Sequence, residues 1–131
     1  DAAILTFGTA IPMGLEAAEI LEEKGINVCV FNARFIKPLD TMMLDEIFNK
    51  KIPIMTVEEG VLAGGFGSAV LEYAHDVSYS EAPIQRMGIP DKFIEHGDVN
   101  ELLAEIGMTA DHLAQNVLSI LPKKTVERGV V

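Results

Sequence analysis

The sequence predicts an α/β domain in three layers: an open, mostly parallel sheet of about five strands with helices on both faces. Short apolar runs alternate along the chain with segments of helical periodicity. The apolar runs carry almost no charge, as expected for parallel strands that are covered on both faces. The chain has 131 residues, of which 49% are hydrophobic and 23% charged, so one domain can bury a core without disulfides or a metal.

Four apolar runs are predicted to be strands, and the chain between them to form crossover connections. They span residues 2–7, 27–32, 52–57 and 84–88. The second run contains the only cysteine, Cys29, which we expect to be a small buried hydrophobic residue. Because a single cysteine allows no disulfide within the chain, the sequence suits a reducing compartment.

Helices are predicted after the first three strands and again at the end of the chain. Helical spacing begins near Met13, and Gly25 is predicted to end that helix. Polar residues with N-cap chemistry precede three later apolar stripes. These caps are Asp40, Asp98 and Thr109, and a further helix is expected from Phe66.

The sequence predicts one domain over residues 1–122, followed by a tail, residues 123–131, that is disordered or a linker. The net charge is −10, which argues against nucleic acid and anionic membrane surfaces as partners, since both require a basic face. No apolar run approaches a membrane span and no signal peptide is visible, so we expect a cytoplasmic protein. The strand pattern starts almost at residue 1, which we interpret as a domain from a larger assembly.

Ligands of open α/β sheets bind beyond the carboxyl ends of the strands, and the glycine-rich loop at residues 58–68 is the most informative such loop. Gly64, Gly65 and Gly67 precede a helix start, where free N–H groups favour an anion. A tight helix entry is the alternative interpretation, and no P-loop lysine follows. Glu58 and Glu59 are expected to point to opposite sides of a strand, with one of them solvated.

Two further loops carry ionisable residues. Arg34 follows the second strand, where its guanidinium could clamp a carboxylate or phosphate, or form an internal salt bridge with Glu58 or Asp40. His96 lies in a charged loop, where it could titrate near neutrality or order a subunit contact. No set of residues completes a reaction, and the sequence shows no cluster with metal-ligand spacing. These loops are therefore expected to contribute to a site shared with another domain.

Four segments together resemble the C-terminal domains of transketolase-type enzymes. The run F-N-A-R-F-I-K-P-L-D at 31–40 resembles their R-F-I/V-K-P-L-D signature, although Asn32 and Ala33 differ from many relatives. V-E-E-G at 57–60 with G-G-F-G-S at 64–68 resembles a second signature, and I-L-T-F-G-T at 4–9 resembles the opening strand and turn. The run G-I-P-D-K-F-I-E-H-G at 88–97 resembles most closely the 1-deoxy-D-xylulose-5-phosphate synthases within this family.

The resemblance implies the C-terminal one of three α/β domains in a dimeric enzyme. Such an enzyme binds thiamine diphosphate and Mg²⁺ between its first two domains, and condenses pyruvate with glyceraldehyde 3-phosphate for isoprenoid biosynthesis. No cofactor, metal or catalytic residue is then expected in this chain. The matching positions are expected to order domain and dimer interfaces, with a substrate-phosphate contact as the alternative for Arg34 or the glycine loop. They are Arg34, Glu58, Glu59, Gly64, Gly65, Gly67, Ser68 and His96.

Other classes of protein stay open at this point. The β subunits of 2-oxo-acid dehydrogenases end in a related docking domain, although the I-E-H-G stretch at 94–97 argues against them. A stand-alone anion-binding module is another possibility. A receiver domain requires an aspartate where Glu58 and Glu59 end the third strand, and a flavodoxin requires a Ser/Thr-rich loop at residues 8–12.

Overall fold

The computed structural model describes residues 1–91 and 96–123 of the chain. Its four strands form one parallel sheet in the order β2-β1-β3-β4. The strands are β1 (Ala2–Phe7), β2 (Val28–Ala33), β3 (Ile54–Val61) and β4 (Ile84–Ile89). The helices are η1 (Gly8–Ala10), α1 (Ile11–Glu23), α2 (Thr41–Asn49), α3 (Phe66–Asp76), α4 (Val99–Glu105) and α5 (Ala110–Ile120).

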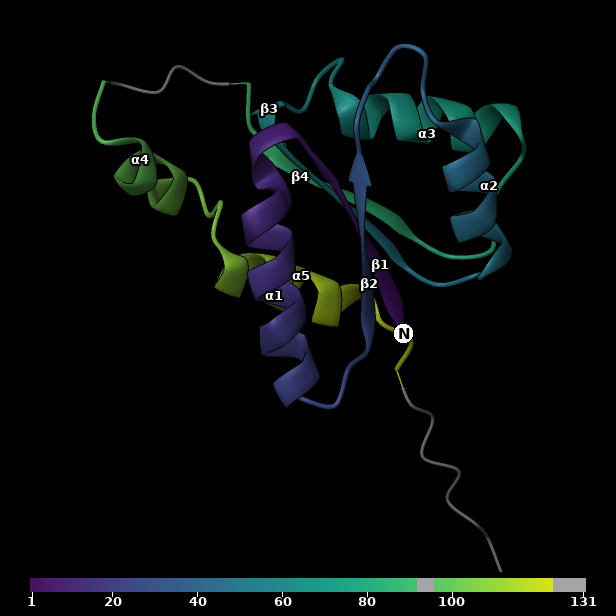
Figure 1. The fold of residues 1–131 in the computed structure, drawn as a ribbon, viewed down its shortest axis with the longest axis horizontal. Coiled ribbons are helices and arrows are strands. Elements are labelled where there is room, and N and C mark those ends of the chain that lie inside the picture. Colours follow the sequence, from purple (N-terminus) through teal and green to yellow (C-terminus); the bar gives the residue numbers. More distant parts are fainter. Residues whose placement is uncertain (92–95, 124–131) are drawn as a thin grey trace, which may run out of the picture.

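Helices cover both faces of the sheet, so the predicted three-layer α/β fold is confirmed. Figure 1 shows the sheet from its β2 edge, with α1 and α5 on one side and α2 and α3 on the other. Successive residues of β1 point to opposite faces: Ile4 belongs to the buried cluster that contains Leu113 of α5, and Leu5 to the cluster that contains Leu44 of α2. The two resulting cores lie on either side of one sheet and give the loops above it a rigid base.

Three predicted helix caps are confirmed. The Asp40 carboxylate accepts a hydrogen bond from the Met43 N–H at 3.0 Å. Asp98 and Thr109 cap α4 and α5 in the same way. Such caps contribute about 1 kcal/mol each, because they satisfy N–H groups that the helix cannot pair. Gly25, at a φ of +76°, follows the end of α1 as predicted.

Two expectations from the sequence are wrong. The described residues form four strands rather than about five, since only the four apolar runs named as strands are strands. Cys29 is exposed rather than buried, because β2 lies at an edge of the sheet. An apolar run identifies a strand but does not give its place in the sheet.

Parts of two predictions lie outside the described residues: positions 92–95 of the segment 88–97, and positions 124–131 of the predicted tail. Across the described ranges, no helix is both long and apolar enough to cross a membrane.

Candidate functional site

The candidate site lies where the sheet order reverses, between the carboxyl ends of β1 and β3. After β1 the chain continues to β2 on one side, whereas β3 pairs with β1 on the other side. Loops leaving two such strands diverge, and the crevice between them is the usual ligand position in open α/β sheets. A pocket of about 300 Å³ occupies this position. Its lining comes from Phe7–Thr9, Ile36, Glu58–Val61 and Ala63–Gly65.

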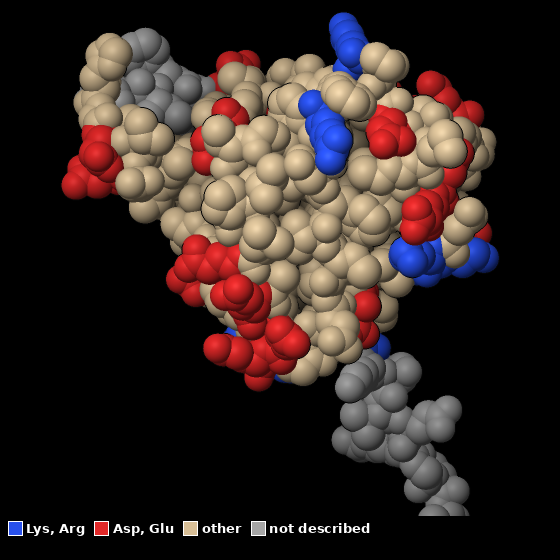
Figure 2. All heavy atoms as spheres, in the orientation of Figure 1, with Lys and Arg blue, Asp and Glu red and all other residues tan. Residues whose placement is uncertain are grey.

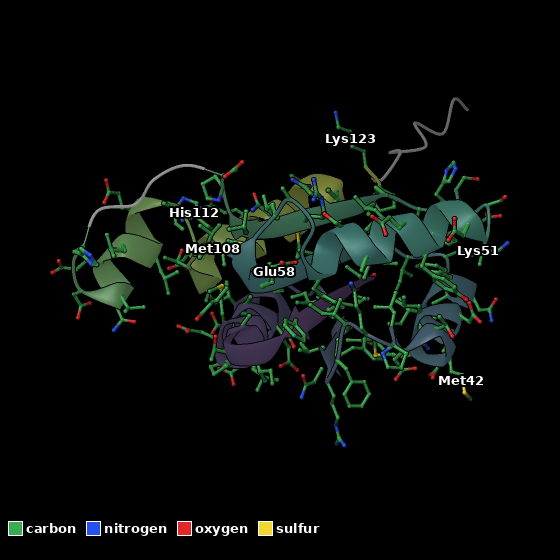
Figure 3. All side chains as sticks on the ribbon, turned by 90° about the horizontal axis from the view of Figure 1, so that it is seen from above. Met42, Lys51, Glu58, Met108, His112 and Lys123 are labelled. Carbon is green, nitrogen blue, oxygen red and sulfur yellow. The ribbon has the colours of Figure 1, made fainter. Side chains whose placement is uncertain are left out.

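Glu58 holds the glycine-rich loop against the start of α3. Its side chain is buried, with 3% of its surface exposed. Its two carboxylate oxygens accept hydrogen bonds from the N–H groups of Phe66 at 3.0 Å and Gly67 at 2.6 Å. Figure 3, drawn from the carboxyl ends of the strands, shows Glu58 near the middle of the molecule. The negative charge also interacts favourably with the positive end of the helix dipole.

Glu58 therefore occupies N–H groups of the glycine-rich loop that the sequence left free for an external anion. Two of them at the helix start already bind an anion, and that anion is a carboxylate of the same chain. A Cβ on Gly65 would collide with the Glu58 carboxylate and with the Val61 carbonyl oxygen. The glycine therefore permits the close approach of the loop to Glu58, which supports the tight helix entry over an external anion at these two N–H groups.

Glu58 and Glu59 point to opposite sides, and their environments differ accordingly. Glu59 is exposed, and its Oε2 accepts a hydrogen bond from the Thr9 hydroxyl at 2.6 Å. This contact joins the loop after β1 to the end of β3 across the mouth of the pocket. The two carboxylates consequently do not form a paired acid and base, as their alternation along the strand predicts.

Ser68 and Arg86 fix the other end of the glycine-rich loop. The Ser68 hydroxyl donates to the Leu62 carbonyl at 2.7 Å. Arg86 Nη1 donates to the same carbonyl and to Ser68 Oγ, both at 2.9 Å. Sequence reasoning missed Arg86 and Thr9. Arg86 sits inside a strand, and no local signal shows that its side chain reaches back to a loop 18 to 24 residues earlier.

The remaining predicted residues lie elsewhere. Arg34 is exposed and is absent from the pocket lining. Within residues 1–91 and 96–123 it forms no salt bridge with Glu58 or Asp40, because Glu58 is engaged by backbone N–H groups and Asp40 caps α2. His96 is exposed as well. The structure therefore gathers Glu58, Glu59 and the glycines into one site and leaves the two basic residues outside it.

The described residues do not fit a diphosphate-bound metal. In the ranges that the structure covers, no three His, Cys, Asp or Glu side chains lie close enough to hold an ion. The α3 N-terminus, which could have received a diphosphate, is occupied by Glu58. The pocket offers one exposed carboxylate and one hydroxyl beside the ring of Phe7, which stacks on the buried Phe66 at a centroid distance of 5.6 Å.

The fold and the motifs around this crevice point to one family of domains. Residues 1–113 match the family described as "Transketolase, C-terminal domain". The chain belongs to this family, which excludes receiver domains and flavodoxins.

The curated relatives identify the branch of the family. Over 124 residues the chain is 60% identical to the 1-deoxy-D-xylulose-5-phosphate synthase of Geobacillus thermodenitrificans, and over 125 residues 57% identical to that of Bacillus velezensis. Each comparison covers 95% of this chain but 20% of the relative. The chain thus spans about a fifth of the length of these relatives. The resemblance predicted from the four segments is confirmed, and a 2-oxo-acid dehydrogenase β subunit is not favoured.

Solved structures agree on the fold. A chain described as "Split gene transketolase, inactive beta4 tetramer" superposes with a TM-score of 0.84 at 32% identity, covering 92% of this chain and 39% of that one. A transketolase from Pichia stipitis in complex with sedoheptulose 7-phosphate gives a TM-score of 0.64 at 18% identity, covering 92% of this chain and 16% of that one. The second comparison supports the fold alone.

Proposed function

We propose that this chain is the C-terminal domain of a 1-deoxy-D-xylulose-5-phosphate synthase. The complete enzyme condenses pyruvate with glyceraldehyde 3-phosphate and releases CO₂, using thiamine diphosphate and Mg²⁺. The observation that carries this proposal is 60% identity over 124 residues to one such synthase. Because the chain matches a fifth of that relative, the cofactor and the reacting groups are assigned to the rest of the polypeptide.

The role of this domain is architectural. The polar side chains of the site bind within the domain itself: Glu58 binds the start of α3, and Arg86 and Ser68 bind the loop carbonyl of Leu62. These contacts give the loop that lines the pocket one fixed shape, which another domain can then pack against. The eight motif positions, from Arg34 to His96, are proposed to order contacts with neighbouring domains and with the second subunit of a homodimer in the cytoplasm.

Calorimetry of the 131-residue chain tests the assignment of the cofactor. We expect no heat of binding with thiamine diphosphate plus Mg²⁺, and no turnover of pyruvate. The full-length polypeptide that carries this domain is expected to bind the cofactor and to form 1-deoxy-D-xylulose 5-phosphate. Turnover by the 131-residue chain alone would contradict the assignment of the chemistry to other domains. A full-length protein that is inactive with these two substrates would contradict the assignment to this synthase.

A titration with glyceraldehyde 3-phosphate tests the alternative role of Arg34. Because the N–H groups of Phe66 and Gly67 are already bound to Glu58, we expect the domain to bind the sugar phosphate with no measurable heat. Binding that is lost in Arg34→Ala, but kept in the matched variant Lys37→Ala, would instead make Arg34 a phosphate contact. Both side chains are exposed and lie on the same loop, so neither substitution is expected to affect folding.

Sedimentation tests the proposed homodimer separately. A related chain of known structure is described as an inactive tetramer of its β chain alone, which supports association of this type of domain with further copies. We expect the isolated domain to self-associate at high concentration, because it exposes large apolar side chains including Phe35 and Met42. A strict monomer would argue against an apolar subunit contact on this domain.

A further inference from the structure

The pocket between the ends of β1 and β3 has a lining that is largely apolar and firmly held. Its volume is about 300 Å³, at the lower end of the range for ligand sites in proteins. The ring of Phe7 lines it and stacks on Phe66. Because Phe66 is fully buried, this stack holds the Phe7 ring in one position. Ile36 and Val61 add further apolar surface to the lining.

Two glycines keep this pocket open. Gly8 and Gly64 both line it, and their φ angles are +65° and +71°. A Cβ built on either glycine would meet no atom within 4 Å, so neither is packed against another part of the domain. Gly65, in contrast, lies against the Glu58 carboxylate. The glycine-rich loop therefore has two parts, of which one is closed by Glu58 and the other borders the pocket.

Among the described residues that line the pocket, Glu59 is the charged group that can still accept a hydrogen bond from a ligand. The lining contains no Lys, Arg or His, and both oxygens of Glu58 are engaged by backbone N–H groups. Glu59 is exposed, and its Oε2 accepts the bond from the Thr9 hydroxyl. Within residues 1–91 and 96–123 no hydrogen bond or ion pair involves its Oε1. A carboxylate can accept about four hydrogen bonds, so Oε1 is available to a donor.

The charges around the pocket favour a cation. A second hollow of about 340 Å³ shares Thr9 and Glu59 with the pocket, and its lining also includes Glu16 and Asp111. The whole chain has a net charge of −10. Figure 2 shows acidic groups on both sides of the visible face and basic groups in fewer places. Such a distribution attracts cations and disfavours phosphates and other anions.

The positions of Phe7 and Glu59 set the length of a ligand that reaches both. Phe7 pairs with Glu58 in the parallel register of β1 and β3. Glu59 is therefore one residue beyond that pair and points to the other face of the sheet. Figure 3 looks down on these strand ends and shows Glu58 near their centre. Neighbouring strands are about 4.8 Å apart, a distance that one ring with one short substituent spans.

We infer that this pocket binds a small planar cation, a single aromatic ring that carries an amidine or amine group. The ring lies against Phe7 and Ile36, and the cationic N–H groups donate to Glu59 Oε1. Thr9 orients the carboxylate through its hydrogen bond to Oε2. The site consists only of residues of this domain, so it does not depend on the reaction of the longer polypeptide.

Benzamidine is a suitable probe, because it joins one phenyl ring to a planar cation that can donate two hydrogen bonds to a carboxylate. Saturation-transfer NMR measures its binding to the full-length polypeptide and to the 131-residue chain. For a ligand of this size we expect a Kd on the order of 1 mM for both. Benzyl alcohol is neutral and benzoate is anionic, and both carry the same ring. They are expected to bind at least about tenfold more weakly.

A pair of matched substitutions assigns the binding to Glu59. Glu59→Gln removes the charge and keeps the size of the side chain, and is expected to weaken benzamidine binding at least about tenfold. Glu72→Gln removes the same charge from an exposed position of α3 that does not line the pocket. It is expected to change the Kd by less than about twofold, because solvent and salt screen the distant charge. Both side chains are exposed, so neither substitution is expected to affect folding.

Three results would overturn the inference. Equal effects of the two substitutions would show that binding follows the net charge of the chain and not this pocket. Benzoate that binds as tightly as benzamidine would show an anion site. Binding to the 131-residue chain that is absent from the full-length polypeptide would show that another part of the polypeptide fills the pocket.

The assay for 1-deoxy-D-xylulose 5-phosphate is run on the same full-length preparations. A polypeptide that binds benzamidine through Glu59 but forms no product would contradict the proposed function and keep this site. A polypeptide that forms the product but does not bind benzamidine would do the reverse.

Discussion

The β2 and β4 edges belong to one four-stranded sheet, yet among the described residues only the β4 side is completed by side-chain contacts to a neighbouring loop. Arg86 projects from β4 and binds the loop above it, and that loop is held in turn by Glu58. β2 receives one comparable side-chain contact, the hydrogen bond from the Thr6 hydroxyl to the Phe31 carbonyl at 3.0 Å. The difference teaches that side-chain contacts hold the β4 side to its neighbouring loop, whereas β2 depends mainly on backbone pairing with β1.

The largest expected effect is on the completed side, at the buried carboxylate. Glu58→Ala is expected to lower the free energy of unfolding by about 3 kcal/mol, because it leaves two buried N–H groups without acceptors. The control is Glu59→Ala, where the exposed carboxylate is expected to contribute no more than about 0.5 kcal/mol. Urea denaturation of both variants measures the difference. Equal effects of the two substitutions would show that Glu58 does not hold the loop.

Gly67 is expected to show the next largest effect. A Cβ at this position would lie 2.5 Å from Thr56 Oγ1 and 2.9 Å from Arg86 Cδ, so Gly67→Ala is expected to cost about 2 kcal/mol of stability by overpacking. In the matched variant Gly60→Ala, the nearest atom is Glu58 Oε1 at 3.4 Å, and a smaller loss is expected. Thermal unfolding compares them, and an equal melting temperature for both variants would contradict the close packing of α3 against β4.

Among the described residues two buried hydroxyls have no hydrogen-bond partner, those of Thr56 on β3 and of Tyr79 before β4. The Tyr79 ring stacks on Phe48 at a centroid distance of 4.1 Å. Tyr79→Phe is expected to stabilise the domain by up to about 1 kcal/mol, since the unpaired group is removed and the stack is kept. Tyr73→Phe is the control, because that hydroxyl donates to Asp45 at 2.7 Å and its loss is expected to destabilise slightly.

The same two tyrosines predict how stability changes in alkali. Burial, and then the charge of Glu81, raises the pKa of Tyr79 above its ordinary value of 10.0. The hydrogen bond to Asp45 is the main cause that raises the pKa of Tyr73. The folded state therefore holds these protons more tightly than the unfolded state, and stability is expected to fall as pH rises above 10. Tyr79→Phe should reduce this slope, and an unchanged slope would contradict the raised pKa.

The smallest expected effects on stability come from a charge placed on either edge strand of the isolated domain. Cys29→Lys and Gln85→Lys both place a charge on an exposed edge position, so each is expected to change the stability of the 131-residue chain by no more than about 0.5 kcal/mol. Urea denaturation measures both variants, and a larger loss of stability for either one would show that its position is not exposed in the domain.

Much of the fold follows from local pattern. The first strand was predicted at its observed bounds, and Asp40, Asp98 and Thr109 were predicted as the caps that the structure contains. These features depend on residues within a few positions of one another. The expected count of about five strands was slightly too high, because the sequence contains four apolar runs of strand type and the described residues form only those four. The exposure of Cys29 was missed, because strand order depends on pairing between distant segments.

The sequence by itself determined the family, three of the helix caps and the alternation that separates Glu58 from Glu59, since each depends on residue identity and short spacing. Only the tertiary structure decided that Glu58 is the anion bound at the start of α3, that Arg86 reaches the loop at Leu62, and that β2 lies at an open edge. The physical reason is the same in all three cases. The residue type fixes the chemistry of a carboxylate, a guanidinium or an apolar strand. The group that it binds depends on the packing of segments that are far apart in the chain.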